Sequence, residues 1–196
     1  PQSPIPNPHV FKFVYLFLFK IKIKKMNSFQ FHDMDEIIPN FLYLGNSASS
    51  RDIPKLKEFG IKKVLTVMDF GAPSYTKEDN IIHKIIRIGD TYLENIIKYF
   101  GECLNFIKGE EKILVHCMAG ASRSATIVIA YLMWSKKMTY SKAITFVKDK
   151  RFIIFPNPGF RDQLQVFEKN LIQNEYDIDK IKFDSIKWEP KAYGFF

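Results

Sequence analysis

One stretch of nine residues combines a nucleophile, a cation and small side chains at a spacing that suits phosphoryl chemistry. It runs from His116 to Ser124 and reads HCMAGASRS. Cys117 stands near its start, and Arg123 follows six positions later. A cysteine thiolate is a strong nucleophile, and the planar guanidinium of arginine can bind two phosphoryl oxygens at once. The pair predicts attack by Cys117 on a phosphorus atom whose oxygens Arg123 binds.

The segments on either side of this loop predict a phosphate cradle. Residues 113–115 form a short apolar run typical of a buried strand, and residues 124–134 are apolar nearly all round, as in a central helix. A strand, a tight loop and a helix N-terminus aim several backbone N–H groups at one point and add the positive end of the helix dipole. Gly120 permits the turn because it has no Cβ atom. The dipole and Arg123 together favour the thiolate form of Cys117.

Apolar runs and helical spacings alternate along the rest of the chain. This alternation predicts an α/β fold in which helices flank a central, mostly parallel sheet. The expected strands lie at residues 41–44, 64–68, 81–88 and 113–115. The expected helices lie at residues 47–59, 92–107, 124–134, 139–150 and 160–171.

Further motifs bring the chain close to one family. They are LYLG at residues 42–45, Thr126, AYLM at residues 130–133, PNPGF at residues 156–160 and QL at residues 163–164. With them, the sequence resembles the protein-tyrosine phosphatase superfamily and, more narrowly, the small atypical dual-specificity phosphatases. The resemblance covers about residues 35–171 and implies the protein-tyrosine-phosphatase-like fold. It also implies hydrolysis of phosphotyrosine and of phosphoserine or phosphothreonine in proteins through a phosphocysteine intermediate, without a cofactor.

The resemblance assigns roles to the residues of the loop. Cys117 is the nucleophile, and Arg123 binds the equatorial phosphoryl oxygens together with loop amides. These amides belong to Met118, Ala119, Gly120, Ala121, Ser122 and Arg123. Ser124 donates a hydrogen bond to the sulfur and helps it leave, or caps the following helix, or does both. His116 supports the thiolate from behind the loop, or is a buried histidine that satisfies local backbone groups. Asn157 braces the site, or serves the turn between two prolines.

The leaving alkoxide or phenoxide needs a proton, so a general acid is required. The family takes it from an aspartate on the loop after the strand that precedes the long helix. Asp90 stands at that point, and Asn95 and Ile96 follow at the usual spacing. We therefore assign this role to Asp90, for which a helix cap is the alternative role. Asp69, which also follows an expected strand, is the competing candidate.

The interior of the loop bears on the substrate. It holds no Lys or Arg between Cys117 and Arg123, whereas phosphoinositide phosphatases of the superfamily tend to carry basic residues there. This favours phosphoproteins over lipids, with a protein kinase among the candidate partners. One alternative is a phosphatase of the same fold acting on an RNA 5′ end, a glycan or a lipid. The other is an inactive phospho-binding module, which the presence of Cys117, Arg123 and Asp90 disfavours.

The cysteines and histidines indicate the cellular compartment and whether a metal site is expected. The chain has two cysteines, Cys103 and Cys117, which are too few for a disulfide scaffold in 196 residues. A reducing compartment is expected, namely the cytoplasm with the nucleus as an addition. We expect Cys103 to pack in the core, with a redox partnership with Cys117 as the alternative. His9, His32 and His83 show no metal-ligand spacing, so no metal is expected.

The ends of the chain differ from its centre. The net charge is +8, but residues 1–25 hold five lysines and no acid, and the remainder carries only +3. No nucleic-acid partner is therefore expected. The apolar run at residues 10–19 is too short to span a bilayer, so no stable membrane insertion is expected, although a weak surface anchor is an alternative. Met26 opens a more ordinary sequence and is the expected true start. The expected parts are a disordered or non-native extension over residues 1–33, a dual-specificity phosphatase catalytic domain over residues 34–175 and a tail over residues 176–196.

Overall fold

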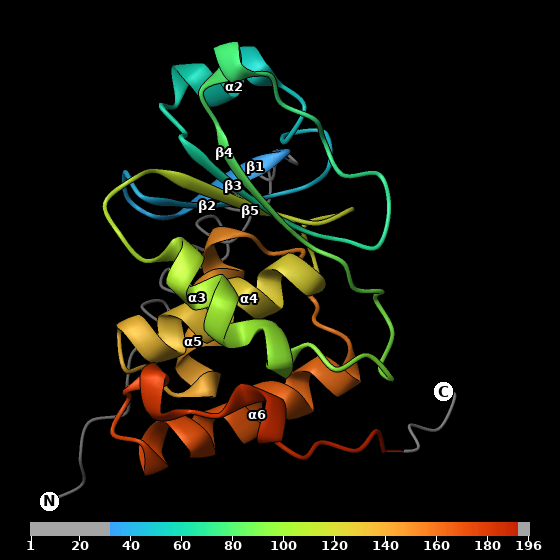
Figure 1. Ribbon diagram of the computed structural model, residues 1–196, viewed down its shortest axis with the longest axis vertical. Helices are drawn as coiled ribbons and strands as arrows, with labels where there is room; N and C mark the ends of the chain where they lie inside the picture. Colours follow the sequence, from blue (N-terminus) through green and yellow to red (C-terminus); the bar gives the residue numbers. More distant parts are fainter. Residues whose placement is uncertain (1–31, 192–196) are drawn as a thin grey trace, which may run out of the picture. The chain divides into compact units, whose positions relative to one another are not determined.

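A five-stranded sheet in the order β1-β2-β5-β3-β4 forms the centre of the structure (Figure 1). The computed structural model describes residues 32–191, and those from Asp33 onward form one compact unit. Four strands run parallel to one another, namely β2 (Leu42–Gly45), β3 (Lys63–Val67), β4 (Ile82–Ile86) and β5 (Ile113–His116). The expected α/β fold with a mostly parallel sheet is confirmed.

The remaining strand, β1 (Met34–Ile38), pairs antiparallel with β2, and the sequence does not predict it. Asp35 and Glu36 interrupt its apolar pattern, and its register with β2 shifts once. Long-range contacts hold it instead. Ile37 is fully buried, and Glu36 accepts a hydrogen bond of 2.8 Å from the hydroxyl of Tyr43.

Helices cover both faces of the sheet, and each face has its own apolar cluster. Figure 1 shows α2 on one face and the other four α-helices on the opposite face. Under α2, Leu56 packs with Val64 and Leu114. The larger cluster fills the opposite side. The helices are α2 (Ile53–Glu58), α3 (Phe100–Ile107), α4 (Arg123–Ser135), α5 (Tyr140–Lys150) and α6 (Pro158–Gln173).

Helix α4 is the central helix that the sequence predicts. All of its residues from Arg123 to Met133 are buried, which explains why the segment is apolar nearly all round. The helix begins where the loop after β5 ends. Its N-terminus therefore lies at the carboxyl edge of the sheet, which is where ligands bind in open α/β folds.

The expected helix over residues 92–107 is wrong in its first part. Residues 92–96 are irregular, and the 3₁₀ turn Ile97–Tyr99 leads into α3. The side chain of Gln163 on α6 satisfies this backbone, because it accepts from Ile97 N at 2.9 Å and donates to Glu94 O at 2.8 Å. The chain after β4 can therefore form a loop in which these two backbone groups are paired.

The segment after α6 packs onto the larger cluster. Ile181 is buried, and the ring of Phe183 lies 6.0 Å from that of Phe167 on α6. Trp134 Nε1 donates to the carbonyl oxygen of Tyr176 at 3.0 Å. The described part of the expected tail thus contributes to the same core as the helices.

The expected domain limits at residues 33 and 175 stay predictions. Residues 1–31, with the apolar run at 10–19 and Met26, lie outside the described residues, as do residues 192–196. No helix in the part of the chain that the structure describes has the length and hydropathy needed to cross a bilayer.

The C-terminal packing predicts a measurable cost of truncating Ile181. Ile181→Ala should lower the free energy of unfolding by about 2 kcal/mol, because it removes buried methyl groups from the cluster. Ile172→Ala on α6 is the matched control, since Ile172 is 60% exposed, and it should change the value by less than about 0.5 kcal/mol. Urea unfolding measures both variants. Equal effects would show that the segment adds nothing to the core.

Candidate active site

The loop between β5 and α4, residues 117–122, has every carbonyl oxygen hydrogen-bonded. The donors are His116 Nδ1 for Cys117, Ser47 N for Met118, Arg151 Nη2 for Ala119, Arg151 Nε for Gly120, Phe155 N for Ala121, and Thr126 N and Oγ1 for Ser122, at 2.8 to 3.3 Å. In contrast, no backbone carbonyl within residues 32–191 accepts from the amides of residues 118–122. These N–H groups are therefore available to an anion.

Gly120 is required by the shape of this loop. Its φ is +68°, in the left-handed region. A Cβ atom at this position would also collide with the carbonyl oxygen of Gly45 and with the guanidinium of Arg151. Glycine is therefore needed both for the backbone angle and for the close approach to the end of β2.

Cys117 and Ser124 lie in contact at the head of α4. The hydroxyl of Ser124 donates to Cys117 Sγ over 3.1 Å, and both side chains are buried. The N-cap of α4 is Ser122 rather than Ser124. Of the two roles expected for Ser124, the structure thus brings it into position for the hydrogen bond to sulfur.

Arg123, the residue that follows the loop, has a buried Nε–H group without a hydrogen-bond partner among the described residues. Its side chain is 8% exposed, and its Nη1 donates to Asp69 Oδ1 at 2.9 Å and to the carbonyl oxygen of Ile88 at 3.2 Å. Its Nε is buried and has no hydrogen-bond partner among residues 32–191, although Asp90 Oδ2 lies 3.6 Å away. A buried guanidinium N–H without an acceptor is costly, and a phosphoryl oxygen would supply the missing partner.

Asp90 is attached to the loop through Ser122 and Asn157. Its Oδ1 accepts from Ser122 Oγ at 2.6 Å and from Asn157 Nδ2 at 2.9 Å. Asn157 N also donates to Ser122 Oγ at 3.1 Å, and Asn157 Oδ1 accepts from Phe160 N at the start of α6. Asn157 therefore contacts Asp90 and also caps α6. Oδ2 of Asp90 is the oxygen nearer Arg123.

Asp69, the competing candidate for the acid, also reaches the site, but through Arg123. Burial opposes ionisation of Asp69, yet hydrogen bonds from its own backbone and from Arg123 lower the pKa of this carboxyl below its ordinary value. A carboxylate held in ionised form by Arg123 is a poor proton donor near neutral pH. The geometry thus separates the two aspartates, with Asp69 bound to Arg123 and Asp90 bound to the loop.

His116 lies behind the loop in a chain of hydrogen bonds. Its Nδ1 contacts the carbonyl oxygen of Cys117 at 3.3 Å, and its Nε2 lies 2.7 Å from Thr66 Oγ1, which in turn lies 2.7 Å from His83 Nε2. Burial lowers the pKa of His116 to about 4, so the ring is neutral near pH 7. Because a carbonyl only accepts, Nδ1 carries the hydrogen and Nε2 accepts from Thr66. His116 thus satisfies local backbone while it positions Cys117.

Arg151 is a residue of the site that sequence reasoning misses. Its side chain is 3% exposed, and it donates to two loop carbonyls and to Asp35 Oδ2 at 2.6 Å. A single arginine at the end of an amphipathic helix carries no signal of this role. Asp35 lies on β1, which the sequence also does not predict. Only the fold brings the two together behind the loop.

Cys103 lies apart from this chemistry. It is fully buried in the larger apolar cluster, and burial raises the pKa of its thiol. A thiol that resists ionisation is a poor redox partner, so the structure favours core packing. Within residues 32–191, no three His, Cys, Asp or Glu side chains are grouped as metal ligands would be.

Comparisons with known proteins agree with this geometry. The family model for the dual specificity phosphatase catalytic domain matches residues 42–170. Dual specificity protein phosphatase 1B of Arabidopsis thaliana is 40% identical over 146 residues, which cover 72% of this chain and 86% of that protein. Dual specificity protein phosphatase 1 of the same plant is 37% identical over 148 residues, which cover 74% of each chain.

Solved structures show the same fold. The human tyrosine phosphatase-like serine/threonine/tyrosine-interacting protein is 36% identical, with a TM-score of 0.67, and the match covers 71% of this chain and 97% of that one. DUSP15 is 31% identical with a TM-score of 0.67, and the match covers 76% of this chain and 97% of that one. The resemblance to protein-tyrosine phosphatases, the fold class and the expected activity are all confirmed. The chain therefore belongs to the dual specificity phosphatase family, and it is a protein phosphatase.

Proposed function

We propose that Cys117, Arg123, Asp90 and Ser124 hydrolyse phosphotyrosine and phosphoserine or phosphothreonine through a phosphocysteine. One observation carries the assignment of these residues. The Nε of Arg123 is buried and unpaired, and Arg123 directly follows the loop that begins at Cys117. The carboxyl of Asp90 is hydrogen-bonded to Ser122 of the same loop. A nucleophile, a phosphoryl-binding cation and an acid thus meet around one group of free amides.

In the first step, the thiolate of Cys117 attacks phosphorus and the bond to the substrate oxygen breaks. The loop amides and Arg123 bind the equatorial oxygens, where negative charge is spread in a loose transition state. Asp90, protonated on Oδ2, gives its proton to the departing oxygen. The two donors on Oδ1 fix the direction in which Oδ2 points.

In the second step, water attacks the phosphocysteine and the bond between phosphorus and sulfur breaks. Asp90, now a carboxylate, takes a proton from the attacking water, as the reverse of its first role requires. The electron pair returns to Cys117 Sγ as a thiolate. The hydroxyl of Ser124, which lies 3.1 Å from that atom, stabilises the leaving charge.

The substrates that we propose are phosphorylated proteins, a protein kinase among them, in the cytoplasm and also in the nucleus. The loop interior supports a protein substrate, because it offers no cation besides Arg123 for additional phosphates. Both cysteines are free thiols, as a reducing compartment would keep them. A panel of phosphopeptides, 5′-phosphorylated RNA, phosphorylated glycan and phosphoinositide tests this. Faster turnover of a non-protein phosphate than of every peptide would overturn it.

Substitution of the nucleophile should abolish turnover. Cys117→Ser should lower kcat for a phosphotyrosine peptide by more than about a thousandfold, because an alcohol without an adjacent base is a poor nucleophile. The variant should still bind the peptide, which isothermal titration calorimetry can measure. Activity within tenfold of the wild type would exclude phosphocysteine chemistry. If the wild type binds the peptide as tightly as the variant does but does not hydrolyse it, the protein is a phospho-binding module.

The two aspartates should differ in how the leaving group affects them. Asp90→Asn should slow phenyl phosphate by about 10²–10⁴-fold. It should slow a fluorinated phenyl phosphate far less, since that leaving group is stable as an anion. Asp69→Asn is the comparison. Asp69→Asn should lower the rates for the two phenyl phosphates by a similar factor. It removes a hydrogen-bond partner of Arg123, whereas Asp90→Asn removes the proton donor.

The measurement is the slope of log kcat/KM against the pKa of the leaving group. A steep slope for Asp69→Asn with an unchanged slope for Asp90→Asn would reverse the assignment. A flattened basic limb of the pH profile in Asp90→Asn would support it, because that limb reports deprotonation of the acid.

Arg151 is proposed as a positioning residue, and it has a matched control in Asp35. Arg151→Met leaves the carbonyls of Ala119 and Gly120 without their donors. It should lower kcat about tenfold or more and the unfolding free energy by about 3 kcal/mol. Asp35→Asn removes the ion pair but leaves both loop hydrogen bonds in place. It should lower stability while kcat stays near the wild-type value. Equal loss of kcat in the two variants would show that Arg151 acts only through stability.

A further inference from the structure

Four large apolar side chains stand in solvent on the loops that carry the active site. They are Phe70 at 64% exposed, Leu93 at 60%, Met118 at 43% and Phe155 at 66%. Each is on a different connection, namely those after β3, β4 and β5 and the one between α5 and α6. Single exposed apolar residues are ordinary on a protein surface, but four on the loops of one site call for an explanation. We name these four residues the rim.

Every rim loop either forms the phosphate cradle or is hydrogen-bonded to it. Phe70 follows Asp69, whose carboxylate bonds Arg123, and Met118 follows Cys117. Phe155 N donates to the carbonyl oxygen of Ala121 at 2.8 Å. Leu93 lies three residues after Asp90, which Ser122 binds. The four exposed side chains are thus carried by the loops that form or contact the cradle.

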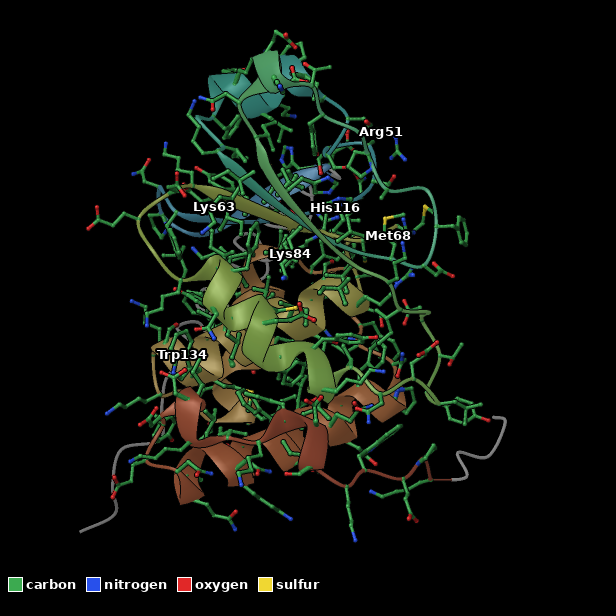
Figure 2. All side chains as sticks on the ribbon, viewed as in Figure 1. Arg51, Lys63, Met68, Lys84, His116 and Trp134 are labelled. Atoms are coloured by element: carbon green, nitrogen blue, oxygen red, sulfur yellow. The ribbon has the colours of Figure 1, made fainter. Side chains whose placement is uncertain are left out.

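Three arginines stand among the rim residues, and each is already engaged. Arg87 Nη1 donates to the carbonyl oxygen of Asp69 at 3.0 Å. The guanidinium of Arg161 lies 5.3 Å from the ring centroid of Phe155. Arg51 donates to the carbonyl oxygens of Ser47 and Gly71. Figure 2 shows Arg51 and Met68 toward the end of the sheet opposite Lys63, as expected for loops that follow the strands. Arg51 and Arg87 remain exposed despite these contacts, so cations and apolar side chains share this surface, and the cations attract an anionic phosphopeptide as a whole.

The carboxylate of Asp69 opposes acidic neighbours in the substrate. Asp69 is on the loop of Phe70. A Glu or Asp placed near Asp69 would be repelled once the phosphate has taken Arg123. A large apolar side chain at the same place would instead be removed from water against the rim.

From these observations we infer that the rim binds the residues on either side of the phosphorylated residue. The substrate is then a phosphoprotein segment with large apolar side chains next to the phosphorylated position. This inference rests on the proposed function and adds a substrate class to it. An extended peptide suits this site, because its side chains on both sides of the phosphate can each meet a different rim loop. A lipid bilayer is the other apolar partner, and it is an outcome of the test.

The test compares three phosphotyrosine peptides that differ only in the two residues flanking the phosphotyrosine, which are Leu, Ser or Glu. We expect kcat/KM for the Leu peptide to exceed that for the Ser peptide by about tenfold, because each flanking side chain buries apolar surface. The Glu peptide should be slower than the Leu peptide, because Glu offers the rim little apolar surface to cover. A ratio of Leu to Ser near one, or the Glu peptide as the fastest, would overturn the inference.

Variants of the rim test whether its residues cause the preference for the Leu peptide. The double variant Phe70→Ser, Phe155→Ser should bring the Leu peptide to within about twofold of the Ser peptide. Ile172→Ser is the control, since Ile172 is as exposed but lies on α6 outside the rim, and it should keep the full preference. Thermal unfolding of each variant checks that the exposed substitutions leave the fold intact. Full preference in the double variant would overturn the role of the rim.

Two further substrates separate this inference from the proposed function. If p-nitrophenyl phosphate is hydrolysed while all three peptides resist, protein phosphatase activity of this site fails, and the inference fails with it. If all three peptides react alike, only the rim inference fails. If a phosphoinositide in phosphatidylcholine vesicles exceeds every peptide, and the double variant abolishes that excess, the rim binds a bilayer and the inference is wrong.

Discussion

The site depends on one constraint, which is that the loop after β5 must keep its amides free while its carbonyls are all bonded. A buried carbonyl without a donor costs free energy, so a loop of this shape needs donors from outside itself. They come from His116, the backbone of Ser47 after β2, α4, Arg151 and the backbone of Phe155. Much of the fold can be understood from this requirement. The order of the strands brings the end of β2 beside β5, and the connection between α5 and α6 returns to the carboxyl edge of the sheet.

The acid is part of the same hydrogen-bonded unit. Ser122, a loop residue, donates to Asp90 and accepts from the backbone of Asn157, and Asn157 starts α6. The segment that carries Asp90 is irregular and needs its own partners, which Gln163 on α6 supplies. The start of α6 therefore contacts the proposed acid through Asn157 and the segment that follows it through Gln163. This explains why a motif far from Cys117 in the sequence belongs to its chemistry.

The parts of this structure that the sequence predicts are those whose contacts are local. The loop, its strand and its central helix are contiguous, and their residue types alone indicate the geometry. The missed parts depend on distant pairs. Asp35 and Arg151 are 116 positions apart. The first turn expected for the long helix fails because a side chain 66 positions away bonds Ile97. Asp69 reaches Arg123 across 54 positions, so no spacing in the sequence could indicate that it is a partner of the arginine.

The electrostatics of the site follow from the burial of His116. With its pKa near 4, this ring stays neutral above about pH 5, so it adds no positive charge beside the sulfur in the physiological range. The thiolate of Cys117 must then be stabilised by what remains, namely Arg123, the hydroxyl of Ser124 and the N-terminus of α4. Arg123 is shared with Asp69 and Asp90, so its net attraction for an anion is weaker than that of a free guanidinium. In the proposed mechanism the backbone amides therefore carry a large share of phosphate binding, and the donors behind the loop hold those amides in place.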